Sequence, residues 1–324
     1  MKVLIADKFP HHAFERLSAM GHNVDLQPAL MGPSLMTELP DVEVLVVRST
    51  QVTGEMLVSA NQLRLIVRAG AGTNAIDKAT AHEHGIYVCN VPGRNANAVA
   101  ELTMGLLISI DRRIPDNVAA LRAGRWDKKA YSLARGLYGR RMGIIGLGAT
   151  GCAVAQRALA FGMQVYGIDR PGRINKRRSE IEALGIKIGS DLATMVEHCD
   201  IVSFHVPSTD ITRGMINSKF LSSLMPGTII LNLSRGDLVN ENALIEAIES
   251  KQLFVGLDVY QNEPAALEGP FDSPLARHAN VYGTHHIGAS TAEAQDAVAA
   301  GVVEVIDQFV KGHLVNCVSH TMAN

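Results

Sequence analysis

A short apolar run that leads into closely spaced glycines constrains the fold of this chain more than any other feature. In "MGIIGLGATG" the residues Gly146, Gly148 and Gly151 follow the pattern G-x-G-x-x-G, and an Ala-rich helical pattern comes next. A strand, a tight glycine turn and a helix in this order are typical of a doubly wound dinucleotide-binding sheet. The chain is therefore expected to contain such a domain.

Each glycine has its own physical role in such a turn. The first permits the tight bend, the second lets the backbone approach a pyrophosphate, and the third allows the helix to pack closely. The first N–H groups of the helix and the positive end of its dipole attract phosphate. The motif thus predicts that the cofactor is bound by Gly146, Gly148, Ala149, Thr150 and Gly151.

The end of the next predicted strand, "MQVYGID", indicates which dinucleotide is bound. Asp169 lies about 20 residues after the second glycine, where a carboxylate can accept hydrogen bonds from the adenosine ribose. The cations of "RPGRINKRR" follow and could instead receive the 2′-phosphate of NADP. Because Asp169 would repel that phosphate, we expect NAD, with NADP as the alternative.

The rest of the chain alternates short apolar runs with helical patterns. This alternation predicts two successive α/β series with parallel sheets. The longest helical patterns are 95–113 and 290–312, and the first is expected to lead through "IPDNVAALRAGRW" into a polar, basic loop. The expected strands are "KVLIAD", "EVLVVRS", "LRLIVRAGAG" and "IYVCNVPG" in the first series, and "RMGIIGLG", "MQVYGID", "IVSFHVP", "GTIILNLS", "FVGLDVY" and "NVYGTHH" in the second.

Composition excludes several classes of protein. A net charge of -2 gives no basic surface for nucleic acid, and a content of 5% aromatic residues argues against a platform for stacking bases. The apolar runs are too short to cross a bilayer, so no membrane partner is expected. The four cysteines have no CxxC spacing, and we read no signal peptide, so we expect thiols in the cytoplasm and no metal site.

Potential catalytic side chains follow the later strands. Arg235 comes after "GTIILNLS", and its guanidinium can hold a carboxylate bidentately. Downstream lie Asp258 and Glu263 in "GLDVYQNEP", and His285 and His286 in "THHIGAST". A His beside a carboxylate makes a general acid/base. From the residues alone, each of these side chains has a structural alternative, either a surface ion pair or a packed histidine.

Several motifs in fixed order resemble those of the D-isomer-specific 2-hydroxyacid dehydrogenases, most closely the D-3-phosphoglycerate dehydrogenase branch. The resemblance covers nearly the whole chain and implies two Rossmann-like or flavodoxin-like α/β domains with parallel sheets. A substrate domain would comprise 1–94 and 286–324, and an inserted NAD-binding domain 95–285, with substrate in the cleft between them. The motifs are "VRST", "VRAGAGTNAID", "NANAVAELTMG", "IIGLGATG", "HVPSTDITRGMI", "LNLSRGDLVNENAL", "LDVYQNEP" and "HIGASTAEAQ".

The resemblance implies that Arg235, Glu263 and His286 form the catalytic set. The family usually has Pro before this His, where this chain has His285, so two adjacent imidazoles compete for the role. We choose His286 because "IGAS" fixes the register, and because adjacent residues of an extended segment point opposite ways.

The resemblance also implies the binding residues. Asp258 would lie near the nicotinamide carboxamide, and Asn95 would either contact substrate or only cap the long helix. The "RAGAG" loop would hold the substrate carboxylate with backbone N–H groups, and basic side chains would hold a distal phosphate. Further cofactor contacts would come from His205, Pro207, Thr212 and Ser234. The substrate contacts would be Arg48, Ala69, Gly70, Ala71, Gly72, Asn95 and Arg235.

The function implied is NAD-dependent hydride transfer between the cofactor and a D-2-hydroxy or 2-keto acid, with 3-phosphoglycerate of serine biosynthesis as first choice. Alternatives are a hydroxypyruvate or glyoxylate reductase, a dehydrogenase of a sulfonate or phosphonate acid, and a non-enzymatic NADH-sensing corepressor. A homodimer or homotetramer is expected, formed through the long helix and "RWDKKAYSLARG". The chain ends at Asn324, so we expect no regulatory domain and no inhibition by serine.

Overall fold

The chain forms two compact units. The computed structural model describes residues 1–168, 175–189, 191–264 and 268–319. The units are Met1–Asn95 with Ser290–Asn324, and Ala96–Ala289. The unit boundaries thus fall after 95 and 289, against the predicted 94 and 285. The residues just before Ser290 group with the second unit because the backbone N–H groups of Ile287 and Gly288 donate to the carboxylate of Asp258.

The first unit is built on a five-stranded parallel sheet in the order β2-β1-β3-β4-β5. Its strands β1, β3 and β4 are almost entirely apolar and buried, as expected for a parallel sheet covered on both faces. The strands are β1 (Lys2–Ile5), β2 (Asn23–Leu26), β3 (Val44–Val47), β4 (Leu65–Arg68) and β5 (Tyr87–Asn90).

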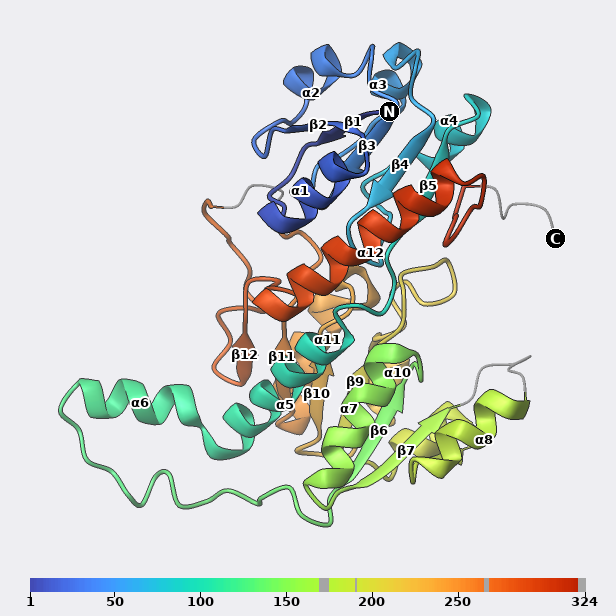
Figure 1. Cartoon of the computed structure of the whole chain (residues 1–324). Helices are drawn as coiled ribbons and strands as arrows, with labels where there is room; N and C mark the ends of the chain where they lie inside the picture. Colours follow the sequence, from blue (N-terminus) through green and yellow to red (C-terminus); the bar gives the residue numbers. More distant parts are fainter. Residues whose placement is uncertain (169–174, 190, 265–267, 320–324) are drawn as a thin grey trace. The chain divides into compact units, whose positions relative to one another are not determined.

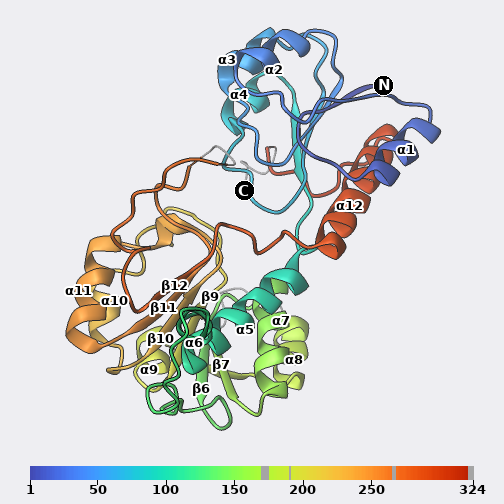
Figure 2. The same cartoon turned by 90° about the vertical axis from the view of Figure 1, so that its left-hand side faces the viewer.

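Helices cover both faces of this sheet because successive side chains of a strand point to opposite sides. Val3 and Ile5 pack with α1 (His11–Ala19) and α12 (Ala292–Val310), whereas Leu4 packs on the other face. Figure 2 shows α1 and α12 on one side of the strands and the other helices on the opposite side. The helices of that side are α2 (Pro33–Glu38), α3 (Gly54–Ser59) and α4 (Lys78–Glu83).

The second unit contains a seven-stranded parallel sheet in the order β12-β11-β10-β9-β6-β7-β8 (Figure 1). The chain enters at β6, moves outward through β7 and β8, and returns to place β9 on the other side of β6. The strands are β6 (Arg141–Ile145), β7 (Gln164–Ile168), β8 (Lys187–Gly189), β9 (Ile201–Phe204), β10 (Ile229–Asn232), β11 (Phe254–Leu257) and β12 (Val281–Gly283).

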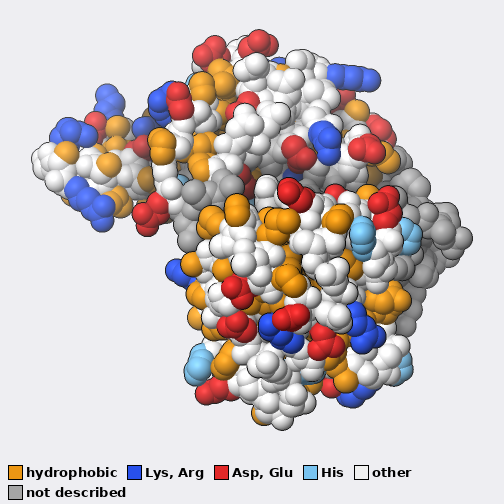
Figure 3. All heavy atoms as spheres, turned by 90° about the horizontal axis from the view of Figure 1, so that it is seen from above, with side chains coloured by type: hydrophobic (Ala, Val, Ile, Leu, Met, Phe, Trp, Pro, Cys, Tyr) orange, Lys and Arg blue, Asp and Glu red, His pale blue; other side chains and the backbone are white. Residues whose placement is uncertain are grey.

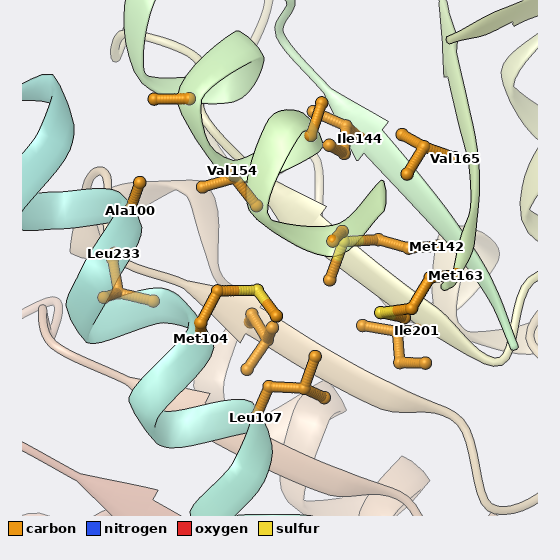
Figure 4. Packing of buried hydrophobic residues seen from close by; sticks show 14 of the residues in the cluster. Ala100, Met104, Leu107, Met142, Ile144, Val154, Met163, Val165, Ile201 and Leu233 are labelled. Carbon is orange, nitrogen blue, oxygen red and sulfur yellow. The ribbon is translucent and has the colours of Figure 1, made fainter. Parts of the chain in front are cut away.

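Two apolar layers hold helices against this sheet. Figure 4 shows the first layer, with Met104 and Leu107 of α5 pointing toward Met142 and Ile201 of the strands. The second layer joins the opposite sheet face to α9, α10 and α11. The helices of the first layer are α5 (Ala96–Arg112), α7 (Ala149–Ala160) and α8 (Asn175–Ala183); those of the second are α9 (Leu192–Val196), α10 (Ser218–Ser222) and α11 (Glu241–Lys251).

The elements that the sequence did not predict lie at the periphery. Strands β2 and β8 are short, partly exposed sheet edges, so their residues lack the continuous apolar pattern of the inner strands. The segment "IPDNVAALRAGRW", to which the sequence assigned no element of its own, forms α6 (Ile114–Arg122), and this helix begins after Arg113 in the left-handed conformation. No helix among the described residues is both long enough and apolar enough to cross a membrane.

The segment of α6 and the residues that follow it exposes apolar and basic side chains together. Trp126, Leu133 and Tyr138 are 81%, 84% and 88% exposed. In Figure 3 this segment lies at the left of the view, where hydrophobic and basic side chains are side by side. Surfaces of this composition are typical of contacts with other protein chains.

Leu45, fully buried in β3, tests the packing of the first unit. Leu45→Ala is expected to lower the free energy of unfolding by about 2–5 kcal/mol, because it removes buried methyl groups and leaves a cavity. Met31→Ala, at a side chain that is 67% exposed, serves as the control and should change stability by about 0.5 kcal/mol or less. Equal shifts of the two variants in urea denaturation would contradict the described core.

Candidate active site

The predicted residues of the second unit gather at one edge of its sheet. Its strands are all parallel, so their carboxyl ends meet there. Open α/β sheets bind ligands at this edge, where the strand order reverses, and here the reversal lies between β6 and β9. The residues along the edge are His286 after β12, Asp258 and Glu263 after β11, Ser234 and Arg235 after β10, His205 and Pro207 after β9, and Gly146, Gly148, Ala149, Thr150 and Gly151 after β6.

The glycine turn after β6 has the close approaches that its pattern predicts. Gly146 has φ of +101°, and a Cβ on it would lie 2.4 Å from the carbonyl oxygen of His205. A Cβ on Gly151 would lie 2.0 Å from the carbonyl oxygen of Gly146. A side chain at Gly146 would therefore push the turn away from β9. A side chain at Gly151 would push α7 away from the turn.

The space beside Gly148 is open. A Cβ built there meets no atom within 4 Å, and Gly148 begins α7 without a side-chain cap. The first N–H groups of this helix therefore remain available for an anion. These residues fit the pyrophosphate of a dinucleotide. Asp169, predicted to bind the ribose, lies outside the described residues, as do Arg170 and Arg173 of the basic run.

His205 closes the turn from the side of β9. Its backbone N–H donates to the carbonyl of Ile145 over 2.7 Å, and Nε2 lies 2.8 Å from Ser203 Oγ. Burial lowers the pKa of His205 to about 4, so the imidazole is neutral near pH 7. Thr212 donates to the carbonyl of Pro207 over 2.6 Å. The Thr212 hydroxyl thus orders the loop that contains Pro207.

A buried amide that the sequence analysis missed shapes the turn of Arg235. Asn232, 0% exposed, accepts hydrogen bonds from the N–H and hydroxyl of Ser234 through Oδ1. Its Nδ2 donates to the carbonyl of Arg235 over 2.8 Å. Burial lowers the pKa of Arg235, and the charges of Asp237 and Glu263 oppose that shift. The signal for Asn232 was a polar residue at the end of an otherwise apolar strand.

His286 and Glu263 form the hydrogen-bonded pair that the resemblance implied. His286 Nδ1 lies 2.7 Å from Glu263 Oε1. An ionised carboxylate only accepts hydrogen bonds, so the proton lies on Nδ1 and the lone pair of Nε2 is left for another partner. No such bond joins His285 to a carboxylate in the part of the chain that the structure describes.

The reason given for preferring His286 was partly wrong. The segment is not extended at this residue, because His286 has φ of +52°, in the left-handed region. The two imidazoles are therefore distinguished by the turn at His286 and by its bond to Glu263, and not by strand alternation.

Asp258 holds this turn in place. Its carboxylate, 1% exposed, accepts bonds from the Thr284 hydroxyl and from the N–H groups of Ile287 and Gly288, over 2.7 to 2.8 Å. Predicted as a contact of the nicotinamide carboxamide, Asp258 here binds both sides of the His286 turn. Asp258 thereby fixes the backbone on both sides of His286, and its contact with the carboxamide stays a prediction.

The predicted substrate residues of the first unit follow adjacent strands. The Asp7 carboxylate accepts from the backbone N–H groups of Arg48, Ser49 and Thr50, which fixes the turn after β3. No hydrogen bond or ion pair to the Arg48 guanidinium is found among the described residues.

The "RAGAG" loop follows the neighbouring strand β4. Gly70 has φ of +138°, and the Arg68 guanidinium lies against it, while Asn90 Nδ2 donates to the carbonyl of Ala71. The N–H groups of Ala71 and Gly72 have no acceptor among the described residues, as an anion-binding loop requires. Ala69 donates its N–H to the carbonyl of Val47 in β3. Asn95 directly precedes α5, with no side-chain cap bond described for it.

No group of three or more potential metal ligands occurs in the described ranges.

Gly148 offers a direct test of the dinucleotide turn. Gly148→Ala fits the backbone, which has φ of −82°, and meets no neighbour, so the fold should keep its thermal stability. The methyl group would occupy the space that a pyrophosphate needs, so the Kd for NADH should rise on the order of tenfold or more. Gly105→Ala, in an equally open position of α5, is the matched control. Unchanged NADH binding by Gly148→Ala would contradict the proposed path of the pyrophosphate.

Comparisons with known proteins agree with this geometry. The family model for the D-isomer specific 2-hydroxyacid dehydrogenase NAD-binding domain matches residues 104–288. The D-3-phosphoglycerate dehydrogenase of Methanocaldococcus jannaschii is 39% identical over 97% of this chain and 58% of that protein. The hydroxypyruvate reductase of Thermotoga maritima is 41% identical over 84% of this chain and 86% of that protein. A solved glyoxylate reductase from Paecilomyes thermophila has a TM-score of 0.85 and 28% identity, covering 98% of each chain.

These matches confirm the predicted family, the α/β fold and the NAD-binding domain. The chain spans little more than half, 58%, of the length of the phosphoglycerate dehydrogenase that it matches. The match between residues 104 and 288 includes the glycine turn, Arg235, Glu263 and His286. The chain belongs to the D-isomer-specific 2-hydroxyacid dehydrogenase family.

Proposed function

We propose that this protein is an NAD-dependent dehydrogenase of D-2-hydroxy acids, working in either direction between the hydroxy and the keto acid. The observation that carries the proposal is the 2.7 Å bond between His286 Nδ1 and Glu263 Oε1 at the sheet edge that also carries the glycine turn. A dinucleotide turn alone supports binding, whereas an oriented imidazole beside it supports proton transfer.

His286 is the proposed acid/base. With its Nδ1–H donating a hydrogen bond to Glu263, the imidazole presents Nε2 as the base that takes the proton from the substrate hydroxyl. Glu263 holds the ring in this tautomer and stabilises the imidazolium that forms. In the reverse direction the same Nε2–H donates to the keto oxygen.

Arg235 is the proposed anchor of the substrate carboxylate. Its guanidinium can bind a carboxylate bidentately, and its positive charge also stabilises the developing charge on the oxygen at C2. The turn held by Asn232 fixes the backbone from which this side chain extends. When bound, NAD supplies the hydride acceptor.

For the substrate we propose 3-phosphoglycerate and its keto form, as in serine biosynthesis. Support comes from the Arg48 guanidinium, which has no described partner, and from the relative named D-3-phosphoglycerate dehydrogenase. A phosphate is a strong ligand for such a cation. The N–H groups of Ala71 and Gly72 are proposed to bind the substrate carboxylate.

Hydroxypyruvate reduction is the second candidate, favoured by the relative of that name at 41% identity. Its substrate has the same carboxylate and a keto group at C2 but no phosphate, so Arg48 would be dispensable. A dehydrogenase of a sulfonate or phosphonate acid would need Arg48 as well. An NADH-binding corepressor would keep cofactor affinity and show no turnover.

We further propose a cytoplasmic homodimer or homotetramer. The exposed Trp126, Leu133 and Tyr138 of the α6 segment support this, because burial of large apolar side chains between copies would stabilise an oligomer.

Variants at the two adjacent histidines test the proposed acid/base. His286→Ala is expected to lower kcat by about 10²–10⁴, because no side chain would then transfer the proton. His285→Ala should keep most of the activity, since no carboxylate among the described residues is bonded to that ring. The measurement is nicotinamide absorbance with D-3-phosphoglycerate and with hydroxypyruvate. Full activity of His286→Ala, together with loss of activity in His285→Ala, would mean that His285 and not His286 is the acid/base.

Arg48 tests the substrate. Arg48→Gln is expected to raise the KM for 3-phosphoglycerate on the order of tenfold, through loss of a charge-assisted bond, and to leave the KM for hydroxypyruvate nearly unchanged. Arg16→Gln removes an exposed cation from α1 of the same unit and is the control. Higher kcat/KM for hydroxypyruvate than for 3-phosphohydroxypyruvate, with no effect of Arg48→Gln, would reject the phosphorylated substrate.

A further inference from the structure

Two cysteines far apart in the sequence face each other in the first unit. Cys89 lies in β5, and Cys317 lies in the segment after α12, paired with it in an isolated antiparallel bridge. Asn90 donates its N–H to the carbonyl of Asn316 over 3.1 Å, and Val318 donates to Val88 over 2.7 Å. The final described residues are thus added to the edge of the five-stranded sheet at β5.

These two hydrogen bonds define the kind of pair that the cysteines form. Both bonds flank Cys89 and Cys317, and neither joins the two residues themselves, so they are a non-hydrogen-bonded pair. In such pairs the Cα atoms are about 4.5 Å apart and the side chains lie on the same face. Disulfides need Cα separations of about 4.4–6.8 Å, so the backbone need not move to join the two sulfurs.

The surroundings of the two sulfurs differ. Cys89 is buried, with 1% of its surface exposed, whereas Cys317 is half-buried. Burial raises the pKa of Cys89 to about 12, and the neighbouring Cys317 adds to the shift. An oxidant from solvent therefore reaches Cys317 first, and the Cys89 thiol stands beside it to react next.

We propose that Cys89 and Cys317 form a reversible disulfide that fastens the C-terminal segment to β5 when the protein meets a peroxide. Hydrogen peroxide oxidises the Cys317 thiol to a sulfenic acid with release of one water. The Cys89 sulfur then attacks the Cys317 sulfur, the S–S bond forms, the S–O bond breaks and a second water leaves. In total the two thiols lose two electrons and two protons. The peroxide accepts them as its O–O bond breaks, and its two oxygen atoms leave as two waters. A dithiol reductant reverses the change by exchange.

The linkage would join the two chain segments of the first unit covalently. In the described residues, those segments, Met1–Asn95 and the one that begins at Ser290, meet through apolar packing, hydrogen bonds and ion pairs such as Arg94–Glu304. Closing so long a loop restricts the unfolded chain, so the oxidised protein should unfold at a higher temperature than the reduced protein.

The test uses the full chain, hydrogen peroxide as the probe and mapping of tryptic peptides without reduction. Peptide 79–94, which contains Cys89, should appear linked to peptide 312–324, which contains Cys317. The number of thiols titrated after denaturation should fall from four to the two of Cys152 and Cys199, and dithiothreitol should restore all four. The higher unfolding temperature should vanish with the same reductant.

Cys317→Ser and Cys89→Ser should each abolish the linked peptide, while Cys152→Ser, at a buried cysteine of the second unit, should retain it. Oxidation of Cys317 to sulfinic acid without linkage would overturn the proposal. Linkage only between separate chains, lost on dilution and seen as a dimer without reductant, would also overturn it. An unfolding temperature that falls on oxidation would reject the fastening role.

Discussion

The parallel direction of all seven strands in the second sheet is the constraint on which the candidate site depends. Because every strand ends at the same edge, residues from Gly146 to His286 are brought together although their sequence separation is large. The reversal of strand order between β6 and β9 then opens that edge to a ligand. A single antiparallel strand in this series would send its polar residues to the opposite edge.

Buried polar side chains convert this edge from a set of loops into a defined site. Asn232 and Asp258 are almost completely buried, and each is bonded to the turn that carries a candidate catalytic residue. A buried polar group without partners is costly, so the turns and the side chains that hold them specify one another. Arg235 and His286 thus have fixed backbones even though both side chains remain partly accessible to solvent.

Much of this could be predicted from the sequence, and the omissions have physical causes. The inner strands are recognisable because burial on both faces makes them continuously apolar, whereas β2 and β8 at the edges lack that pattern. The proposed catalytic residues were selected by resemblance to a family, since hydrophobic periodicity does not indicate which polar residues lie together. The resemblance implied the pair of His286 and Glu263, but the left-handed turn at His286 and the bonds of Asn232 were not predicted, because they depend on tertiary packing, which spacing does not encode.

Transfer of isotope tests most directly whether this edge is a dehydrogenase site. The protein would be incubated with NAD and 3-phosphoglycerate of D configuration carrying deuterium at C2, and the cofactor analysed by mass spectrometry. We expect the deuterium to appear in the reduced nicotinamide with the D acid and not with its L enantiomer, because Arg235 is assigned to the substrate carboxylate and His286 to the hydroxyl at C2. The account would be contradicted if the protein bound NADH but transferred deuterium neither from D-3-phosphoglycerate nor from D-glycerate labelled at C2. The protein would then be a cofactor-binding protein without dehydrogenase activity.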